Sequence, residues 1–64
     1  MTEGYEIKQF IKTVNKGWLE TIATCVNERT ALMSFDGLEK EFPDEHFELF
    51  KITHNEVCLK WSKK

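Results

Sequence analysis

The sequence is short of the residues that usually strengthen a protein of 64 residues, since natural proteins this small often add disulfides or a metal. Its only cysteines, Cys25 and Cys58, lack the CxxC spacing of zinc and redox motifs. Both stand in apolar, strand-like segments, where cysteine usually behaves as a small buried hydrophobe, so we expect no structural disulfide. A domain of this length hides only about 60% of the surface of its unfolded chain, and its stability should be modest.

Long hydrophobic runs are also missing. No run approaches the roughly 20 residues that cross a bilayer, which excludes a transmembrane helix. The first residues, MTEGYEIKQF, lack the basic start and continuous apolar core of a signal peptide, so we expect a soluble, cytoplasmic protein with no membrane partner. With 31% charged and 41% hydrophobic residues, and no repeat or low-complexity segment, the composition indicates one globular domain over residues 1–64.

No excess of basic charge is present either. The net charge is −2, whereas nucleic-acid-binding domains are more often basic overall. Six acids and one base between Asp36 and Glu48 give this segment a charge of −5, and the rest of the chain carries +3. The molecule is therefore predicted to have an acidic and a basic side.

The middle of the chain favours strands. The segment WLETIATCVNERTALMSF is rich in Thr, Ile, Val and aromatic residues, and the polar NERT within it indicates a hairpin between strands at about 17–26 and 30–35. Asp36 and Gly37 suit a two-residue hairpin turn, which leads into a third strand at 38–42. Pro43 should end this strand, because proline has no amide hydrogen for the ladder.

The rest of the chain is predicted to add further strands and one helical turn. The segment KITHNEVCLKW at 51–61 indicates two short strands. The apolar spacing of residues 5–14 fits a helix as well as a strand, and we favour the strand because NKG follows it like a hairpin turn. The segment PDEHFELF at 43–50 is predicted to form one short helical turn, with acids near its N-terminus.

Five or six short antiparallel strands in about sixty residues cannot make two stacked sheets of useful area, so a mainly β fold closed into one small barrel is expected. The order GWLETIATCV, NERT, ALMSFDG and LEKEFP resembles Tudor and SH3-like barrels over residues 17–50. This resemblance implies a binding barrel in which Trp18 and Phe35 form an aromatic wall beside Asp36. Leu19 stands where those domains usually have a second aromatic residue, so no complete aromatic cage is identified.

Catalytic and metal-binding constellations are not recognisable. The only histidines, His46 and His54, have no short ligand spacing to the cysteines. The carboxylates lack the regular spacing of a calcium-binding loop. A chain this short also offers little room for a nucleophile, a base and an oxyanion site together. We therefore expect no enzymatic activity, no cofactor and no metal.

The acidic, phenylalanine-rich segment 34–50 leads to the main functional hypothesis, a non-catalytic protein-binding module that acts as a small regulator or adaptor. Its acids form either a solvated face or a contact surface, and its phenylalanines either close the barrel end or meet a partner. An aromatic anchor with acidic residues around it would suit protein binding. The predicted contact residues are Trp18, Phe35, Asp36, Asp44, Glu45, Phe47 and Glu48.

Two alternatives remain open at this point. The first is a nucleic-acid-binding barrel, in which lysines contact phosphates and a tryptophan stacks on bases. Its predicted contact residues are Lys8, Lys12, Lys16, Lys60, Trp61, Lys63 and Lys64. The second is a homo-oligomer, in which an open edge of the barrel pairs with its copy.

Overall fold

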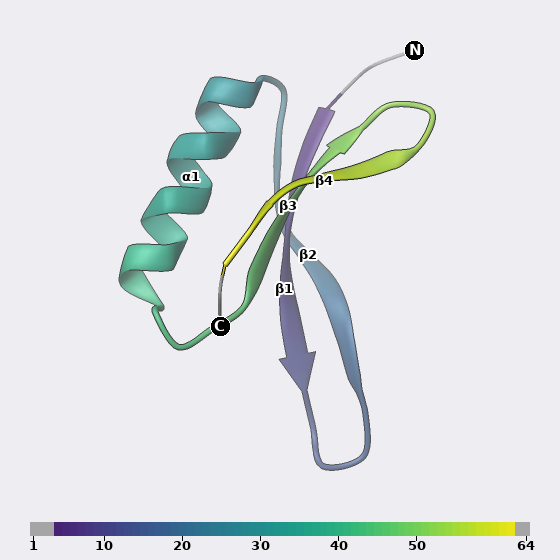
Figure 1. Ribbon diagram of the computed structural model, residues 1–64, viewed down its shortest axis with the longest axis vertical. Coiled ribbons are helices and arrows are strands. Elements are labelled where there is room, and N and C mark those ends of the chain that lie inside the picture. The colour runs from purple at the N-terminus through teal and green to yellow at the C-terminus, as the bar shows by residue number, and fades with distance from the viewer. Residues whose placement is uncertain (1–3, 63–64) are drawn as a thin grey trace.

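The computed structural model describes residues 4–62, which form a four-stranded antiparallel sheet with one helix against one face (Figure 1). In chain order the elements are β1 (Gly4–Lys12), β2 (Gly17–Cys25), α1 (Glu28–Glu41), β3 (Phe47–Ile52) and β4 (Glu56–Trp61). The strands lie in the order β2-β1-β3-β4, so β1 and β3 form the centre of the sheet. The mainly β, antiparallel architecture agrees with the prediction.

The sheet is open, which corrects the expectation of a closed barrel. β2 pairs only with β1 and β4 pairs only with β3, so these two strands lie at opposite edges. The segment expected to supply two of the strands folds as α1 instead, and α1 covers the face that closure of the sheet would have buried. Figure 1 also shows the β1-β2 hairpin continuing beyond the end of α1.

The helix α1 begins with a side-chain cap. Asn27 has an extended backbone, and its side-chain oxygen accepts a hydrogen bond from the Thr30 amide at 2.8 Å. This bond satisfies one of the amide groups that a helix start leaves unpaired. Ala31 and Phe35, four residues apart, are the buried positions of the helix, so they lie on one side of it. The cap and this spacing both favour the helix, and the spacing lets one side of it pack against the sheet.

The expected strands at 30–35 and 38–42, and the turn between them, are therefore wrong. No glycine among residues 4–62 has a positive φ, so Asp36 and Gly37 do not have the backbone conformation of the expected hairpin turn. Gly37 lies in the helix interior at a cost of roughly 1 kcal/mol relative to alanine. Burial of Phe35 alone is worth about as much or more, which explains why the glycine is tolerated.

The segment 43–50 differs from its prediction as well. A tight turn follows α1, closed by a hydrogen bond from the Glu45 amide to the Phe42 carbonyl at 3.1 Å, and β3 begins at Phe47. Phe47 and Leu49 are both buried, so burial follows the two-residue period of a strand rather than a helix. By contrast, β1 confirms the strand favoured for 5–14, and β4 confirms the later of the two strands in 51–61.

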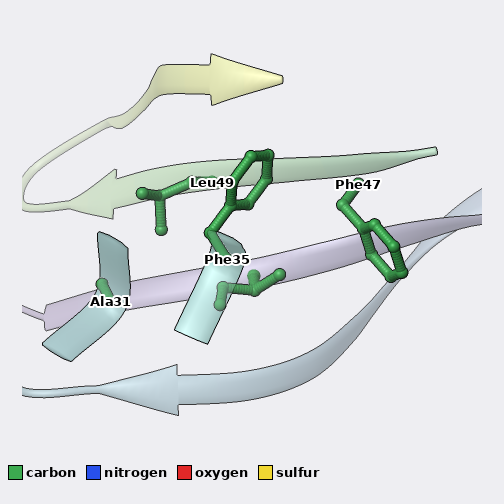
Figure 2. Packing of buried hydrophobic residues seen from close by; sticks show 5 residues of the cluster. Ala31, Phe35, Phe47 and Leu49 are labelled. Carbon is green, nitrogen blue, oxygen red and sulfur yellow. The ribbon is translucent and has the colours of Figure 1, made fainter. Parts of the chain in front are cut away.

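The hydrophobic core lies between α1 and one face of the sheet. Figure 2 shows Ala31 and Phe35 from the helix beside Phe47 and Leu49 from β3. Ile7 of β1 completes the buried cluster. Full burial of a side chain such as Phe, Leu or Ile contributes roughly 1.5–3 kcal/mol, so these few residues dominate stability. The opposite face of the sheet has no helix on it.

Candidate functional site

The sheet face opposite α1 carries charged and aromatic side chains. Successive side chains of a strand point to opposite faces, and Ile7 and Leu49 face the helix. Their neighbours Lys8, Glu48 and Phe50 therefore face away from it. All three are only partly exposed, because they cover one another on this open face.

The positive charge of Lys8 is balanced by neighbouring carboxylates on this face. Its Nζ atom lies 2.5 Å from Glu56 Oε1 and 4.0 Å from Glu6 Oε1. The same ammonium lies 4.8 Å from the centre of the Phe50 ring, in the geometry of a cation–π contact. The hydrogen bond to Glu56 raises the pKa of Lys8 above its ordinary value of 10.5, against the opposing effect of desolvation. Lys8 is thus part of an internal charge cluster.

A cleft of about 750 Å³ lies where the β1-β2 hairpin meets the turn before β3. Its volume is within the range of about 300–1,000 Å³ that ligand sites occupy. The residues that line it are Phe10, Lys12, Leu19, Asp44, Glu45, His46 and Glu48. Phe10 and Leu19 are paired across β1 and β2, and each is 39% exposed. The cleft therefore combines an apolar floor with acids from the turn and from β3.

Hydrogen bonds fix the turn against β1. The Phe10 amide donates to the His46 carbonyl at 2.9 Å, which continues the pairing of β1 and β3 by one step. Gln9 Nε2 donates to Glu45 Oε2 at 3.1 Å. The acidic wall of the cleft is thus attached to the strand that supplies its apolar floor.

His46 lies between a carboxylate and a hydroxyl. Its Nε2 atom is 2.8 Å from Glu48 Oε2, and its Nδ1 atom is 3.5 Å from Ser62 Oγ. In serine hydrolase triads the serine bonds Nε2 and the carboxylate bonds Nδ1, so this order is reversed. Ser62 is only 6% exposed, and its Oγ accepts a hydrogen bond from the Phe47 amide at 2.8 Å. These contacts join the end of β4 to the start of β3 and hold His46 in place.

The two cysteines are free thiols. Cys25 is partly buried and packs against the core, whereas Cys58 lies on exposed β4. Desolvation, and secondly the negative charge of Glu48, raise the pKa of Cys58 above its ordinary value of 9.0. At neutral pH Cys58 is therefore a protonated, weakly reactive thiol.

The structure brings together three of the predicted contact residues, the acids Asp44, Glu45 and Glu48, because all three line the cleft. Two others are corrected. Phe35 and Phe47 are fully buried in the core, so their side chains are not available to a partner. Their burial follows from the helical and strand periods described above.

The remaining predicted contact residues lie outside the cleft. Trp18 in β2 is as exposed as Phe10 and Leu19, and Lys16 Nζ lies 5.9 Å from the centre of its ring. Asp36 is exposed on α1 and pairs with Lys40 at 3.2 Å, four residues along the helix. Because Phe35 is buried while Trp18 is on the sheet, the aromatic wall implied by the barrel resemblance is not assembled.

Phe10 and Leu19 were missed as site residues. The sequence feature that could have identified them is a pair of adjacent apolar residues on each side of the NKG turn, Phe10-Ile11 and Trp18-Leu19. Adjacent apolar residues in a strand place apolar side chains on both faces of the hairpin. Gly17 lies against the Phe10 ring, because a Cβ at this position would lie 2.5 Å from Phe10 Cζ. The missing side chain allows the phenylalanine ring to lie over the glycine.

The residues predicted to bind nucleic acid are dispersed. Lys8 is paired with acids on the open face, Lys12 lines the acidic cleft, and Lys60 Nζ lies 5.5 Å from the ring of Phe35 on the helix side. Trp61 is paired with Glu48 across β3 and β4. Lys63 and Lys64 lie outside the described residues.

Other classes of site are not indicated by the described part of the chain. Residues 4–62 contain no group of three or more His, Cys, Asp or Glu side chains arranged to hold a metal ion. The helix of this region, α1, lacks the length and apolar character needed to cross a membrane. Comparisons with models of protein families, with curated proteins and with solved structures gave no match to this chain.

Proposed function

We propose that the chain is a non-catalytic protein-binding module, a small regulator or adaptor, whose partner binds in the cleft beside β3. The observation that supports this proposal most is the combination of Phe10 and Leu19 with three carboxylates around one hollow. Protein interfaces obtain most of their affinity from a few apolar anchors in desolvated pockets, while charges around them speed encounter and give specificity.

The apolar floor leaves hydrophobic surface in contact with solvent. Phe10 and Leu19 are each 39% exposed, and neither belongs to the buried hydrophobic cluster found among residues 4–62. Burying apolar surface is worth roughly 25 cal/mol per Å², so a partner that covered these two side chains would gain free energy that the isolated chain forgoes.

The site is also prepared for binding before a partner arrives. The backbone hydrogen bond between Phe10 and His46, and the side-chain bond between Gln9 and Glu45, hold the floor and the acidic wall together. Groups that are already ordered lose less conformational entropy on association.

A position-specific cross-link tests this proposal. A photoreactive benzoylphenylalanine replaces Leu19 in the cleft in one preparation, and Met33 on the exposed side of α1 in the control. After irradiation in a native cell extract, the position-19 protein should form discrete adducts with a protein that mass spectrometry identifies, and the position-33 protein should not.

Charge reversal makes the test specific to the acids. The Asp44→Lys/Glu45→Lys variant should lose the position-19 adducts, and the Glu39→Lys/Glu41→Lys variant, with the same total charge, should keep them. Equal labelling from positions 19 and 33, or adducts that survive reversal of the cleft acids, would contradict the proposal.

A further inference from the structure

Two carboxylates of the cleft, those of Glu45 and Glu48, are each held in place through one oxygen. Gln9 bonds one oxygen of Glu45, and His46 lies beside one oxygen of Glu48. An ionised carboxylate has about four lone-pair sites. Within residues 4–62 no hydrogen bond or ion pair involves the second oxygen, Oε1, of Glu45 or of Glu48. Among the described residues, these oxygens therefore have no donor of their own.

The negative charge of the cleft favours hydrogen-bond donors that are positively charged. Its lining residues include three acids and one lysine, so its formal charge is −2 with His46 neutral. Lys12 does not cancel the acids by direct contact, because its ammonium forms no ion pair in the described part of the chain. A basic ligand is attracted to this surface, whereas a polyanion is repelled.

The protein itself shows how such a surface binds an ammonium group. On the open face, Lys8 is placed over the Phe50 ring and bonded to Glu56. The cleft offers the same two kinds of partner, an aromatic ring from Phe10 and carboxylates, with space beside them. An ammonium or guanidinium placed there would combine a cation–π contact with charge-assisted hydrogen bonds.

A positive charge on the ligand would not by itself cover the apolar floor of the cleft. Phe10 and Leu19 present half-exposed apolar surface in the middle of the lining, and a cation without an apolar side chain would leave much of it in water. The ligand that satisfies both parts of the cleft carries a large apolar group next to positive charges. In a protein these features are combined by a segment with a phenylalanine, leucine or similar side chain between lysines or arginines.

We infer that the partner occupies the cleft with a basic protein segment in which lysine or arginine residues flank one large apolar side chain. This inference rests on the proposed function, because it names the chemistry of the partner at the same cleft. The apolar side chain covers Phe10 and Leu19, and the basic groups bond to Glu45 and Glu48.

Three labelled synthetic peptides test the inference by fluorescence anisotropy with the full chain. The first has lysines on both sides of a phenylalanine, the second has alanine instead of this phenylalanine, and the third has glutamates instead of the lysines. The first peptide should bind at least about tenfold more tightly than the second, a ratio that corresponds to loss of one apolar anchor. The third should not bind.

Isosteric variants assign the binding to the cleft. Glu45→Gln/Glu48→Gln removes two charges with little change in shape and should weaken binding of the first peptide about tenfold or more. Glu39→Gln/Glu41→Gln on α1 removes the same charge and should leave the affinity within about twofold. Circular dichroism would show whether the cleft variant folds. If it does not, the salt dependence of binding to the wild-type protein tests the role of charge instead. The first peptide should bind several-fold more weakly at higher salt, because salt screens the attraction between its lysines and the carboxylates.

Three results would overturn the inference: equal affinity for the first and third peptides, unchanged affinity in the cleft variant, or displacement of the peptide by spermidine at equal charge concentration. The last would indicate a site for free polyamines instead of a protein segment. Position-19 cross-linking to a protein, combined with failure of the lysine peptides, would reject only the basic partner. Failure of both experiments would reject the protein-binding function as well.

Discussion

Replacing Gly37 with alanine is expected to stabilise the protein. Gly37 lies in the interior of α1 and does not have a positive φ, so alanine can adopt its backbone conformation. A Cβ at this position would have no atom within 4 Å outside the local helix backbone, so the new methyl group enters open space. Alanine is favoured over glycine inside a helix by roughly 0.5–1 kcal/mol, largely because it restricts the unfolded chain.

The magnitude is large enough to measure. For a domain of about this size, a change of 1 kcal/mol moves the melting temperature by roughly 4–8 °C, so Gly37→Ala should raise it by about 2–8 °C. Thermal unfolding followed by circular dichroism measures this shift. Urea unfolding should give a later midpoint with an unchanged slope, because the surface exposed on unfolding stays the same.

Gly17→Ala is the matched control. A Cβ at Gly17 would lie 2.5 Å from Phe10 Cζ, so the phenylalanine ring has to move away from the strand. Moving this partly exposed ring off the strand exposes more of its apolar surface, which costs on the order of 1 kcal/mol, and we expect a lower melting temperature. The same substitution should therefore have opposite signs at the two glycines.

The result that refutes the helix is a destabilised Gly37→Ala protein. If Asp36 and Gly37 formed the two-residue turn of a hairpin, Gly37 would need a positive φ, and alanine would cost roughly 1–2 kcal/mol there. A fall in the melting temperature would thus favour two strands over α1, and it would remove the helix from the core.

Three further predictions concern a cap, a charge and a thiol. Asn27→Ala removes the acceptor of the Thr30 amide and should destabilise the protein by about 1 kcal/mol in urea unfolding, whereas Asn27→Ser should recover most of the loss. The raised pKa of Lys8 means that the stability from its bond to Glu56 is fully present below pH 10.5 and is lost as the pH rises through the folded-state pKa. The destabilisation caused by Lys8→Met should therefore shrink above pH 10.5, as measured by urea unfolding at several pH values. In a Cys25→Ala background, the raised pKa of Cys58 should make its alkylation near pH 9.0 slower than that of an unstructured cysteine peptide, and equal rates would contradict this.

The first two strands could be predicted from a turn signal rather than from burial. The NKG segment, followed by sequence rich in β-branched and aromatic residues, was sufficient to favour a hairpin, which β1 and β2 confirm, although the apolar spacing of residues 5–14 also fitted a helix. By contrast, the alternate burial of Phe47 and Leu49 in β3 was not recognised as a strand.

The helix was missed although Asn27 is a favourable cap and Ala31 and Phe35 have helical spacing. The adjacent Asp36-Gly37 pair and the β-branched residues before it favoured a hairpin locally. Packing of Phe35 against the sheet decides the structure, and this tertiary contact is not encoded in a short window.

The acidic part of the candidate site could be predicted from charge, because Asp44, Glu45 and Glu48 are close in sequence. The apolar floor could not, since it depends on the register that pairs Phe10 with Leu19 and on the hydrogen bond from Phe10 to His46. Both contacts join segments that are distant along the chain. A shift of one residue in this register would turn these side chains to the other face of the sheet.

The position of the cleft follows from the size of the chain. One helix can cover only one face of the sheet, and Figure 1 shows that the β1-β2 hairpin extends past the end of α1. On the open face the side chains of Lys8, Glu56 and Phe50 contact one another and cover part of the sheet without a second helix. Phe10 and Leu19 lie farther along the hairpin, where the described residues that line the cleft with them are Lys12, the turn residues 44–46 and Glu48 of β3. The small size that limits the core therefore also leaves apolar surface beside negative charge, which is the feature on which the proposed protein-binding function depends.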